Sequence, residues 1–322
     1  MCGCRRLRGL QWQPRHGNRD PHDVRRTEGC IAAGGCRHRR RQHSTRRRSR
    51  MSQQDRGAAC RASRGAAHDR ASHEPAMSAF YVTIERDVIT VTGSDAKSYL
   101  HSQVSNDVNS LEIGDSRYAF LLQPTGKIDV VVRITCATHD RYVLDMEPGF
   151  GEAALARLNR FKIRVRAEME LSGQVWRAIR STEPVRIDGA LRAWSGDGRA
   201  WDVFAPNVGF GDSIPLGAAS DYDAFRLECG WPLMGVDITT DMVPAETGIV
   251  EHAVSFTKGC YPGQELVERM DSRNATPPRQ LRVIERTPEM EVGSPVVRDG
   301  AVIGTVTSLG GQRAFALLKR GA

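Results

Sequence analysis

An abrupt change of composition near residue 77 decides which part of this chain can fold. Residues 1–76 contain 19 Arg, no Lys and six acidic residues, with few large aliphatic side chains and no apolar periodicity. A segment of this kind cannot bury enough apolar surface to offset the conformational entropy lost on ordering. We therefore expect residues 1–76 to be a disordered tail, and the folded part to begin after it.

Three explanations account for the composition of this tail. An arginine-only tract is what GC-rich DNA gives when it is translated upstream of the true start, which would make Met77 the first natural residue. A basic arm that binds RNA and an organelle transit peptide are the alternatives. No amphipathic helix can be drawn through the tail, as a transit peptide would require, so the start at Met77 is favoured.

The positive net charge of the chain comes from the tail. The formal net charge is +8, yet residues 77–322 carry 27 basic against 32 acidic residues. The folded part is therefore mildly acidic, and we expect no direct contact with nucleic acid.

Cysteines and apolar runs indicate the compartment. The folded part keeps only Cys136, Cys229 and Cys260, without a CxxC pair, which favours a reducing cytosol and predicts no metal site. No apolar run reaches about 18 residues. We expect a soluble, cytoplasmic protein that does not associate with a membrane, and a monomer.

The pattern of residues 80–171 is that of an α+β domain with helices packed on an antiparallel sheet. We predict a hairpin over 80–93 with its turn at 85–87, and a helix over 95–108 capped by Ser94-Asp95. Strands follow on both sides of a turn at 123–126, and then over 140–147. A helix over 150–162 and a strand over 163–171 complete the domain.

The second half is more punctuated by Gly and Pro. Strands are expected over 174–181 and 200–206, and a helix over 220–230 that Ser220 or Asp221 caps and Gly230 ends. Another helix follows Pro262-Gly263. Short strands over 279–320 predict a small β-barrel. The expected domains are the tail at 1–76, the main folded region at 77–277 and the barrel at 278–322.

The stretch "KGCYPGQE", residues 258–265, is the strongest chemical signal in the chain. Cys260 stands just before a predicted helix N-terminus and two residues after Lys258, and both features stabilise a thiolate. Gly259 and Gly263 carry no side chains, so another molecule could approach the thiol closely. These are the requirements of a reactive or metal-touching cysteine; the alternative is a buried structural cysteine in a turn.

This stretch resembles the K-G-C-Y-x-G-Q-E signature of the YgfZ/GcvT family. These proteins are folate-binding relatives of the glycine cleavage T-protein that assist iron–sulfur protein assembly or repair. Residues 102–128 are similar to the family's N-terminal block, and "RLECGWPLMGVDI", residues 226–238, to its R-L-E-x-G-x-P-x-x-G-x-D block. "GDGRAWDVFAP", residues 196–206, is a degraded form of the T-protein's G-E-x-G-F-E-I segment. The resemblance covers about residues 80–320.

The resemblance implies three subdomains around a central pocket for tetrahydrofolate or a one-carbon derivative, with a C-terminal β-barrel as the last. It also implies iron–sulfur client or assembly proteins as partners, and Cys260 as the functional thiol beside Lys258. A pterin edge pairs with a carboxylate, a folate tail with arginine, and an aromatic ring could stack on the pterin. The expected cofactor-binding residues are Tyr118, Arg226, Glu228, Glu246, Gly263, Gln264, Glu265 and Arg273, with Arg269 as a further candidate for the tail.

One departure from the T-protein pattern bears on the activity. T-proteins carry an acidic residue that acts on the folate nitrogen, after a G-x-x-x-D-D-like turn. Here the segment reads "TGKIDVVV", so Asp129 is present but Val130 follows it. Asp129 could point to the pocket or to solvent. A T-protein-like aminomethyltransferase, or another folate-dependent one-carbon enzyme, is therefore the alternative function, and a role linked to tRNA modification is the third.

Overall fold

The computed structural model describes residues 79–194, 196–204, 214–273 and 275–321. The expectations for residues 1–76 and for the start at Met77 lie outside the described residues. All described residues belong to one compact unit.

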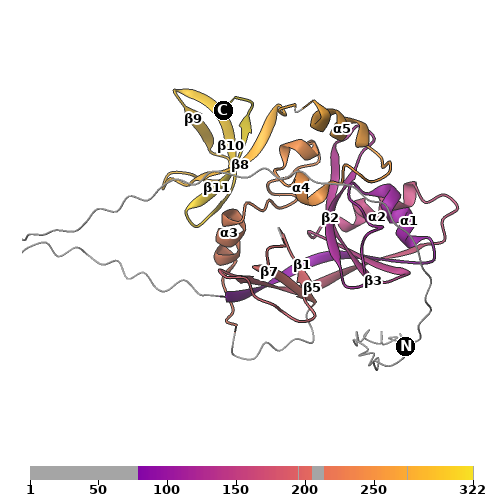
Figure 1. Ribbon diagram of the computed structural model, residues 1–322. Helices are drawn as coiled ribbons and strands as arrows, with labels where there is room; N and C mark the ends of the chain where they lie inside the picture. The colour runs from indigo at the N-terminus through magenta and orange to yellow at the C-terminus, as the bar shows by residue number, and fades with distance from the viewer. Residues whose placement is uncertain (1–78, 195, 205–213, 274, 322) are drawn as a thin grey trace, which may run out of the picture. The chain divides into compact units, whose positions relative to one another are not determined.

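A seven-stranded antiparallel sheet dominates the fold (Figure 1). Its strand order is β2-β3-β4-β1-β5-β7-β6. The strands are β1 (Ala79–Thr92), β2 (Ser116–Leu122), β3 (Ile128–Thr138), β4 (Arg141–Met146), β5 (Glu168–Ser181), β6 (Leu191–Arg192) and β7 (Ala200–Phe204).

The predicted hairpin over residues 80–93 is wrong, because β1 is one continuous strand. It pairs with β5 along its whole length, from Ala79 opposite Ser181 to Thr92 opposite Glu168. Arg86, which suggested a turn, is buried and forms an ion pair with Asp145 on the neighbouring β4. A charged residue with a buried partner fits inside a strand, and a sequence pattern does not reveal that partner.

β5 also joins two predicted strands into one. The strand expected over 163–171 begins only at Glu168, and it continues through Gly173 into the segment expected over 174–181. Pairing with β1 on both sides of Gly173 holds the backbone extended there.

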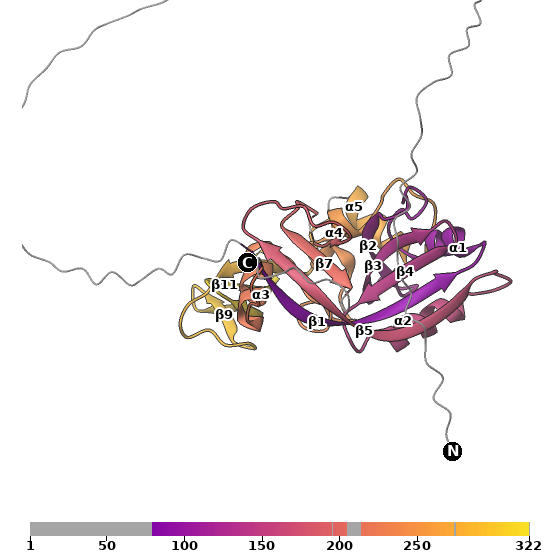
Figure 2. The same cartoon turned by 90° about the horizontal axis from the view of Figure 1, so that it is seen from below.

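Helices α1 (Ala96–Gln103) and α2 (Gly151–Arg160) pack on one face of the sheet. α1 is shorter than the predicted 95–108, because Val104 turns to extended backbone and pairs with Leu121 of β2. The two faces of β3 serve two separate apolar cores. Val130 and Val132 pack in the core with α1 and α2, whereas Ile128 and Val131 pack in the other core. Figure 2 shows α2 below the β1 and β5 part of the sheet and α5 above it.

That opposite side is covered by the C-terminal helices. These are α3 (Ala219–Glu228), the 3-10 helix η2 (Pro244–Glu246), α4 (Val250–Ala253) and α5 (Gln264–Ser272). α3 starts earlier than predicted: Ala218 is its N-cap, and the backbone N–H of Ala218 donates to the carboxylate of Asp221 at 2.8 Å. Gly230 follows the helix with φ +66°, the left-handed turn that the sequence predicted.

The last segment forms a second, four-stranded antiparallel sheet in the order β8-β11-β10-β9. Its strands are β8 (Arg279–Glu285), β9 (Pro295–Arg298), β10 (Ala301–Gly310) and β11 (Arg313–Lys319). The predicted strands are thus present, whereas their closure into a barrel is not confirmed. α3 packs against β10 and β11, and the carboxylate of Asp237 accepts hydrogen bonds from the hydroxyls of Thr307 and Ser308 at 2.6 Å each.

Candidate functional site

Cys260 lies in the loop of residues 254–263, here called the Cys260 loop, which joins α4 to α5. Its thiol is exposed, whereas Cys136 is buried and Cys229 is half-buried. This position rules out the alternative of a buried structural cysteine.

Lys258 anchors the Cys260 loop to the end of α1. Its ammonium donates to the carbonyl oxygens of His101 and Val104, the latter at 2.6 Å. Carbonyls at a helix C-terminus lack intrahelical partners and carry partial negative charge, so a lysine fits there. Burial lowers the pKa of Lys258 to about 8, although Asp107 and Cys260 act in the opposite direction.

Gly263 fixes the other end of the loop. It has φ +83° and is the N-cap of α5. A Cβ atom on it would lie 2.5 Å from the carbonyl oxygen of Gln123 and 2.9 Å from the Cβ of Leu122. The turn between β2 and β3 therefore packs directly on the start of α5, and only glycine fits between them.

The remaining motif residues also have structural contacts. Tyr261 is buried, and its backbone N–H donates to the side-chain oxygen of Gln264 at 3.1 Å. Glu265 is exposed and forms an ion pair with Arg269 at 2.5 Å, one turn along α5. Lys258, Tyr261, Gly263 and Gln264 thus hold the loop in place, and the loop presents the thiol of Cys260 to solvent.

The second feature is a cavity that is lined by aromatic side chains, among them Tyr118. Its described lining includes Tyr118, Trp194, Tyr222 and Trp231, together with Arg86, Glu147 and Asp202. The rings of Tyr118 and Trp231 lie 4.6 Å apart, and the Tyr118 hydroxyl accepts a hydrogen bond from the backbone N–H of Trp194 at 3.2 Å. Burial raises the pKa of Tyr118 to about 12, so the phenol stays neutral.

A row of buried charges crosses the sheet beneath these rings. Arg133 donates to Asp145 at 2.9 Å and to Asp202 at 2.8 Å. Arg86 extends the row to Glu147 at 2.8 Å, and Asp202 accepts from Arg180 at 3.0 Å. The row thus contains three arginines and three carboxylates, so its charges balance. Five of the six residues lie on β1, β3, β4, β5 and β7, and Glu147 lies just beyond β4.

Arg180 is the least satisfied member of that row. Its side chain is fully buried, and its Nε and Nη2 have no hydrogen-bond partner among the described residues. Its guanidinium lies 4.0 Å from the ring centre of Trp194 and 5.0 Å from that of Tyr222. A buried donor without a partner is costly, and it is often explained by a ligand or a water molecule.

The residue types of the cavity fit a pterin ring, whereas its volume does not. Four aromatic walls suit a flat heterocycle, and Glu147 could accept from its amidine-like edge, since its side chain is 19% exposed against 5% for Asp202. The cavity measures about 10 Å³, which admits at most one water molecule. A bicyclic ligand therefore needs the aromatic side chains to move apart.

Asn106 connects the two features. Its amide donates to the carbonyl oxygens of Tyr118 and His252, each at 2.9 Å. His252 in turn packs on Trp231 with 5.8 Å between ring centres. The segment whose carbonyl oxygens accept hydrogen bonds from Lys258 is thus hydrogen-bonded to β2, the strand that contributes Tyr118 to the aromatic cavity.

Two residues predicted to bind folate have partners within the protein. Arg226 is buried and forms ion pairs with Asp223 and Asp237, both at 2.8 Å. Glu246 is buried, accepts the backbone N–H of Val243 and pairs with Arg279 at 3.1 Å. Their charges are neutralised within the protein, which argues against the binding role that the sequence suggested.

The other predicted residues divide between the surface and the sheet. Glu228 and Arg273 are exposed. Asp129 is the extra residue of a β-bulge, because Leu121 pairs with Val130 and Leu122 with Ile128. Its carboxylate lies 3.5 Å from Arg157 of α2, and it is not in the described lining of the aromatic cavity.

Sequence reasoning missed Trp194, Tyr222, Trp231, Glu147 and Asp202. The signal available was a charged or aromatic residue inside a strand or next to one, as in "YVLDME" and "AWDVF". Within the described residues no group of three or more His, Cys, Asp or Glu side chains could hold a metal ion. A membrane-spanning helix is also absent from that part of the chain.

Comparisons with known proteins bear on the family and the fold. No family model matches the chain. It is 24% identical to a protein of Photobacterium profundum named tRNA-modifying protein YgfZ, over 58% of this chain and 64% of the relative. It is 27% identical to a mitochondrial iron-sulfur cluster assembly factor IBA57 homolog of Mycosarcoma maydis, over 57% and 51%. These two matches span less than two thirds of the relatives' length.

Aminomethyltransferases form the third group of relatives. The aminomethyltransferase of Streptomyces avermitilis is 28% identical over 68% of this chain and 71% of its own. The crystal structure of glycine cleavage system aminomethyltransferase T from Bartonella henselae superposes with a TM-score of 0.63, at 20% identity, over 74% of this chain and 78% of the other. The mixed helix-and-sheet fold is that of the aminomethyltransferases. The homologues of this chain are YgfZ, IBA57 and aminomethyltransferase proteins, and its resemblance to the YgfZ/GcvT family is confirmed.

Proposed function

We propose that this protein binds a tetrahydrofolate derivative and supports the assembly or repair of iron–sulfur proteins through Cys260. The observation that carries the proposal is the construction of the Cys260 loop. Lys258, Tyr261, Gly263 and Gln264 hold the loop by buried or helix-capping contacts, and Cys260 between them is exposed. A structure that fixes the backbone around an exposed thiol suits a thiol that meets another molecule.

One cysteine cannot hold an iron–sulfur cluster alone, since clusters take four thiolate-type ligands. Cys260 would therefore act with ligands supplied by a client protein. The names of the YgfZ and IBA57 relatives support a link to iron–sulfur assembly or tRNA modification. The folded part is mildly acidic, so a link to tRNA would be indirect rather than through its phosphates.

The folate would lie in the aromatic cavity, where its ring would be stacked by Trp194 and Trp231. The aromatic walls and the partly exposed carboxylate of Glu147 support a polar, flat ligand there. When bound, the folate would supply or accept a one-carbon unit. The residues named here would orient its ring and exclude water from it.

Aminomethyl transfer is the alternative, and the fold alone favours it. It requires an acid at the folate nitrogen, and Asp129 is engaged with Arg157 on the α2 side of the sheet. Turnover of methylenetetrahydrofolate with an aminomethyl donor by the purified protein, lost in Asp129→Asn, would favour this alternative.

Two measurements test the proposal. Rescue of an iron–sulfur enzyme's activity in a strain lacking the gene should fail with Cys260→Ala and persist with the control Cys229→Ala. Tetrahydrofolate titrated into the full chain should quench tryptophan fluorescence, and Trp231→Leu should weaken binding by about tenfold, unlike Trp176→Phe outside the cavity. Full rescue by Cys260→Ala would refute the role of the thiol.

A further inference from the structure

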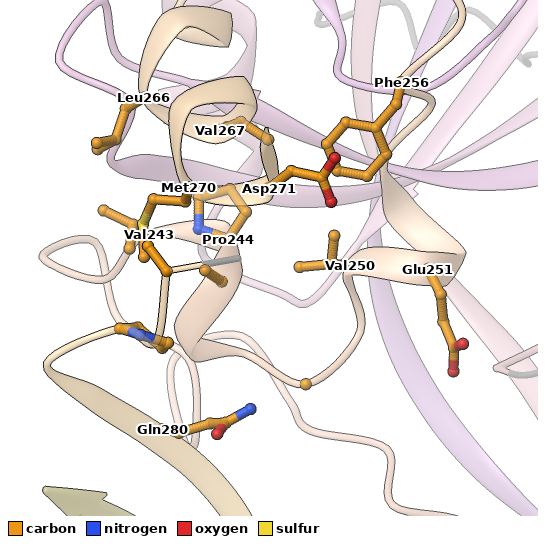
Figure 3. A pocket seen from close by; sticks show the side chains of 14 residues that line it. Val243, Pro244, Val250, Glu251, Phe256, Leu266, Val267, Met270, Asp271 and Gln280 are labelled. Carbon is orange, nitrogen blue, oxygen red and sulfur yellow. The ribbon is translucent and has the colours of Figure 1, made fainter. Parts of the chain in front are cut away.

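An open, mostly apolar groove lies along α5, near the motif (Figure 3). It measures about 330 Å³. Leu266, Val267 and Met270 of α5 form one wall with Val243 beside Met270, and Val250 and Phe256 lie across from them. These side chains come from α5, α4 and the loops that flank it, so the groove is part of the fold and not a gap beside one loop.

The groove leaves apolar surface uncovered. Phe256 is 41% exposed, and on the apolar side of α5 Val267 is buried while Leu266 and Met270 are only half-buried. Folding normally covers such side chains, because exposed apolar surface is unfavourable in water. Contiguous apolar surface of this kind often marks a site of interaction.

The charged residues that line the groove are both acidic. Glu251 and Asp271 are exposed, and Figure 3 shows the Asp271 carboxylate beside Phe256 and the Glu251 carboxylate on the α4 side of the groove. Among the described residues, the only ion pair of Glu251 is with the neighbouring His252, at 3.4 Å, and Asp271 has none. An occupant with a positive charge beside its apolar side chains would match these two carboxylates.

The groove is lined by residues that lie before and after Cys260 in the sequence. Phe256 precedes Cys260 by four residues, and α5 begins four residues after it. Four residues of chain span at most roughly 14 Å, so Cys260 lies within that distance of the Phe256 backbone. A segment seated in the groove would bring the rest of its own protein beside the thiol.

We infer that this groove docks a partner protein through an apolar segment flanked by Lys or Arg. The inference rests on the proposed function and deepens it, since it identifies how a client is held beside Cys260. The groove contains few convergent hydrogen-bonding groups, which a small polar ligand would need. An apolar anchor with a charged rim is instead how protein interfaces are built.

The test uses the full chain in cells, with Phe256 replaced by photoreactive benzoyl-phenylalanine. After irradiation, mass spectrometry should identify a cross-linked peptide from another protein with apolar residues next to Lys or Arg. The same photoreactive residue at Val302, which is 52% exposed on β10, should not give this peptide. Met270→Glu should abolish the cross-link.

The identified peptide is then synthesised with a fluorescein label and titrated with the purified full chain. Met270→Glu should weaken binding by about tenfold. Asp271→Lys, an exposed change that leaves the fold intact, should weaken it by roughly threefold, and Glu289→Lys away from the groove should not. Cross-links only to residues 1–76 or to a second copy of this chain, or binding that ignores Asp271→Lys, would overturn the inference.

The outcomes separate this inference from the proposed function. If Cys260→Ala loses rescue while the cross-link and the peptide affinity are absent, the groove inference fails and the function stands. If the cross-link and its charge dependence hold while Cys260→Ala rescues fully, the groove docks a partner and the thiol has no part in the function.

Discussion

The ammonium of Lys258 donates a hydrogen bond of 2.6 Å to the carbonyl oxygen of Val104, 154 residues earlier in the chain. This bond joins the end of α1 to the Cys260 loop and places a cation two residues from the thiol. Lys258 therefore holds the Cys260 loop in place and also puts a positive charge near the thiol.

The partial burial of Lys258 predicts a pH-dependent contribution to stability. Its pKa falls from 10.5 to about 8 on folding, mainly because burial disfavours the charged form. Between these values the unfolded chain binds a proton that the folded chain has lost, so this group makes stability rise with pH from about 8 to 10.5. The difference in unfolding free energy between wild type and Lys258→Met should change across this window and stay constant below it. A constant difference throughout would contradict the shift.

Gly263→Ala is expected to destabilise the protein and disturb the Cys260 loop. The new Cβ would meet the carbonyl oxygen of Gln123 at 2.5 Å, on a backbone with φ +83°. We expect a loss of at least about 1–3 kcal/mol in urea unfolding, from backbone strain plus the clash. Gly259→Ala is the matched control, because a Cβ there meets nothing within 4 Å. Equal stability of the two variants would show that Gly263 is not packed as described.

The three cysteines of the folded part should differ in reactivity. Cys260 is exposed, Cys136 is buried and donates to the carbonyl oxygen of Thr138 at 3.3 Å, and burial raises the pKa of Cys229 to about 11. Iodoacetamide at pH 7.5, followed by peptide mapping, should label Cys260 at least roughly tenfold faster than the other two. Cys260→Ala should leave both other rates unchanged. Labelling of Cys229 at the rate of Cys260 would be incompatible with this burial.

The sequence predicted local features better than long-range charge pairing. The turn at residues 123–126, the helix after Gly263 and the strands of the C-terminal sheet follow from glycine positions and apolar periodicity, and all are present. The turn at Arg86 was wrong, and the ion pairs of Arg226 were not foreseen, because a charged residue suggests a turn or a ligand when its partner cannot be seen. Those partners, Asp145 and Asp237, are 59 and 11 residues away. Most of the aromatic cavity was not predicted, because its walls come from four separate segments and the sequence does not show that these segments meet.

The buried charge row predicts the largest effect of a single substitution. Arg133→Leu would leave Asp145 and Asp202 in an apolar environment with fewer compensating charges. Removal of one partner from a buried ion pair costs about 3–5 kcal/mol, so we expect a loss of this size in urea unfolding. Arg186→Leu is the control, because its ion pair with Asp188 is exposed; it should unfold as the wild type does.

The same substitution should change the response to acid. Burial alone would raise the pKa of Asp202, but Arg180 and Arg133 outweigh it and hold that pKa below its ordinary value of 3.8. The folded protein thus gains stability from ionised Asp202 above about pH 4, and it loses that stability as the pH falls below. Arg133→Leu should weaken this dependence, measured as the slope of unfolding free energy between pH 5 and pH 3. An unchanged slope, or a cost no greater than that of Arg186→Leu, would mean that Arg133 does not compensate these carboxylates.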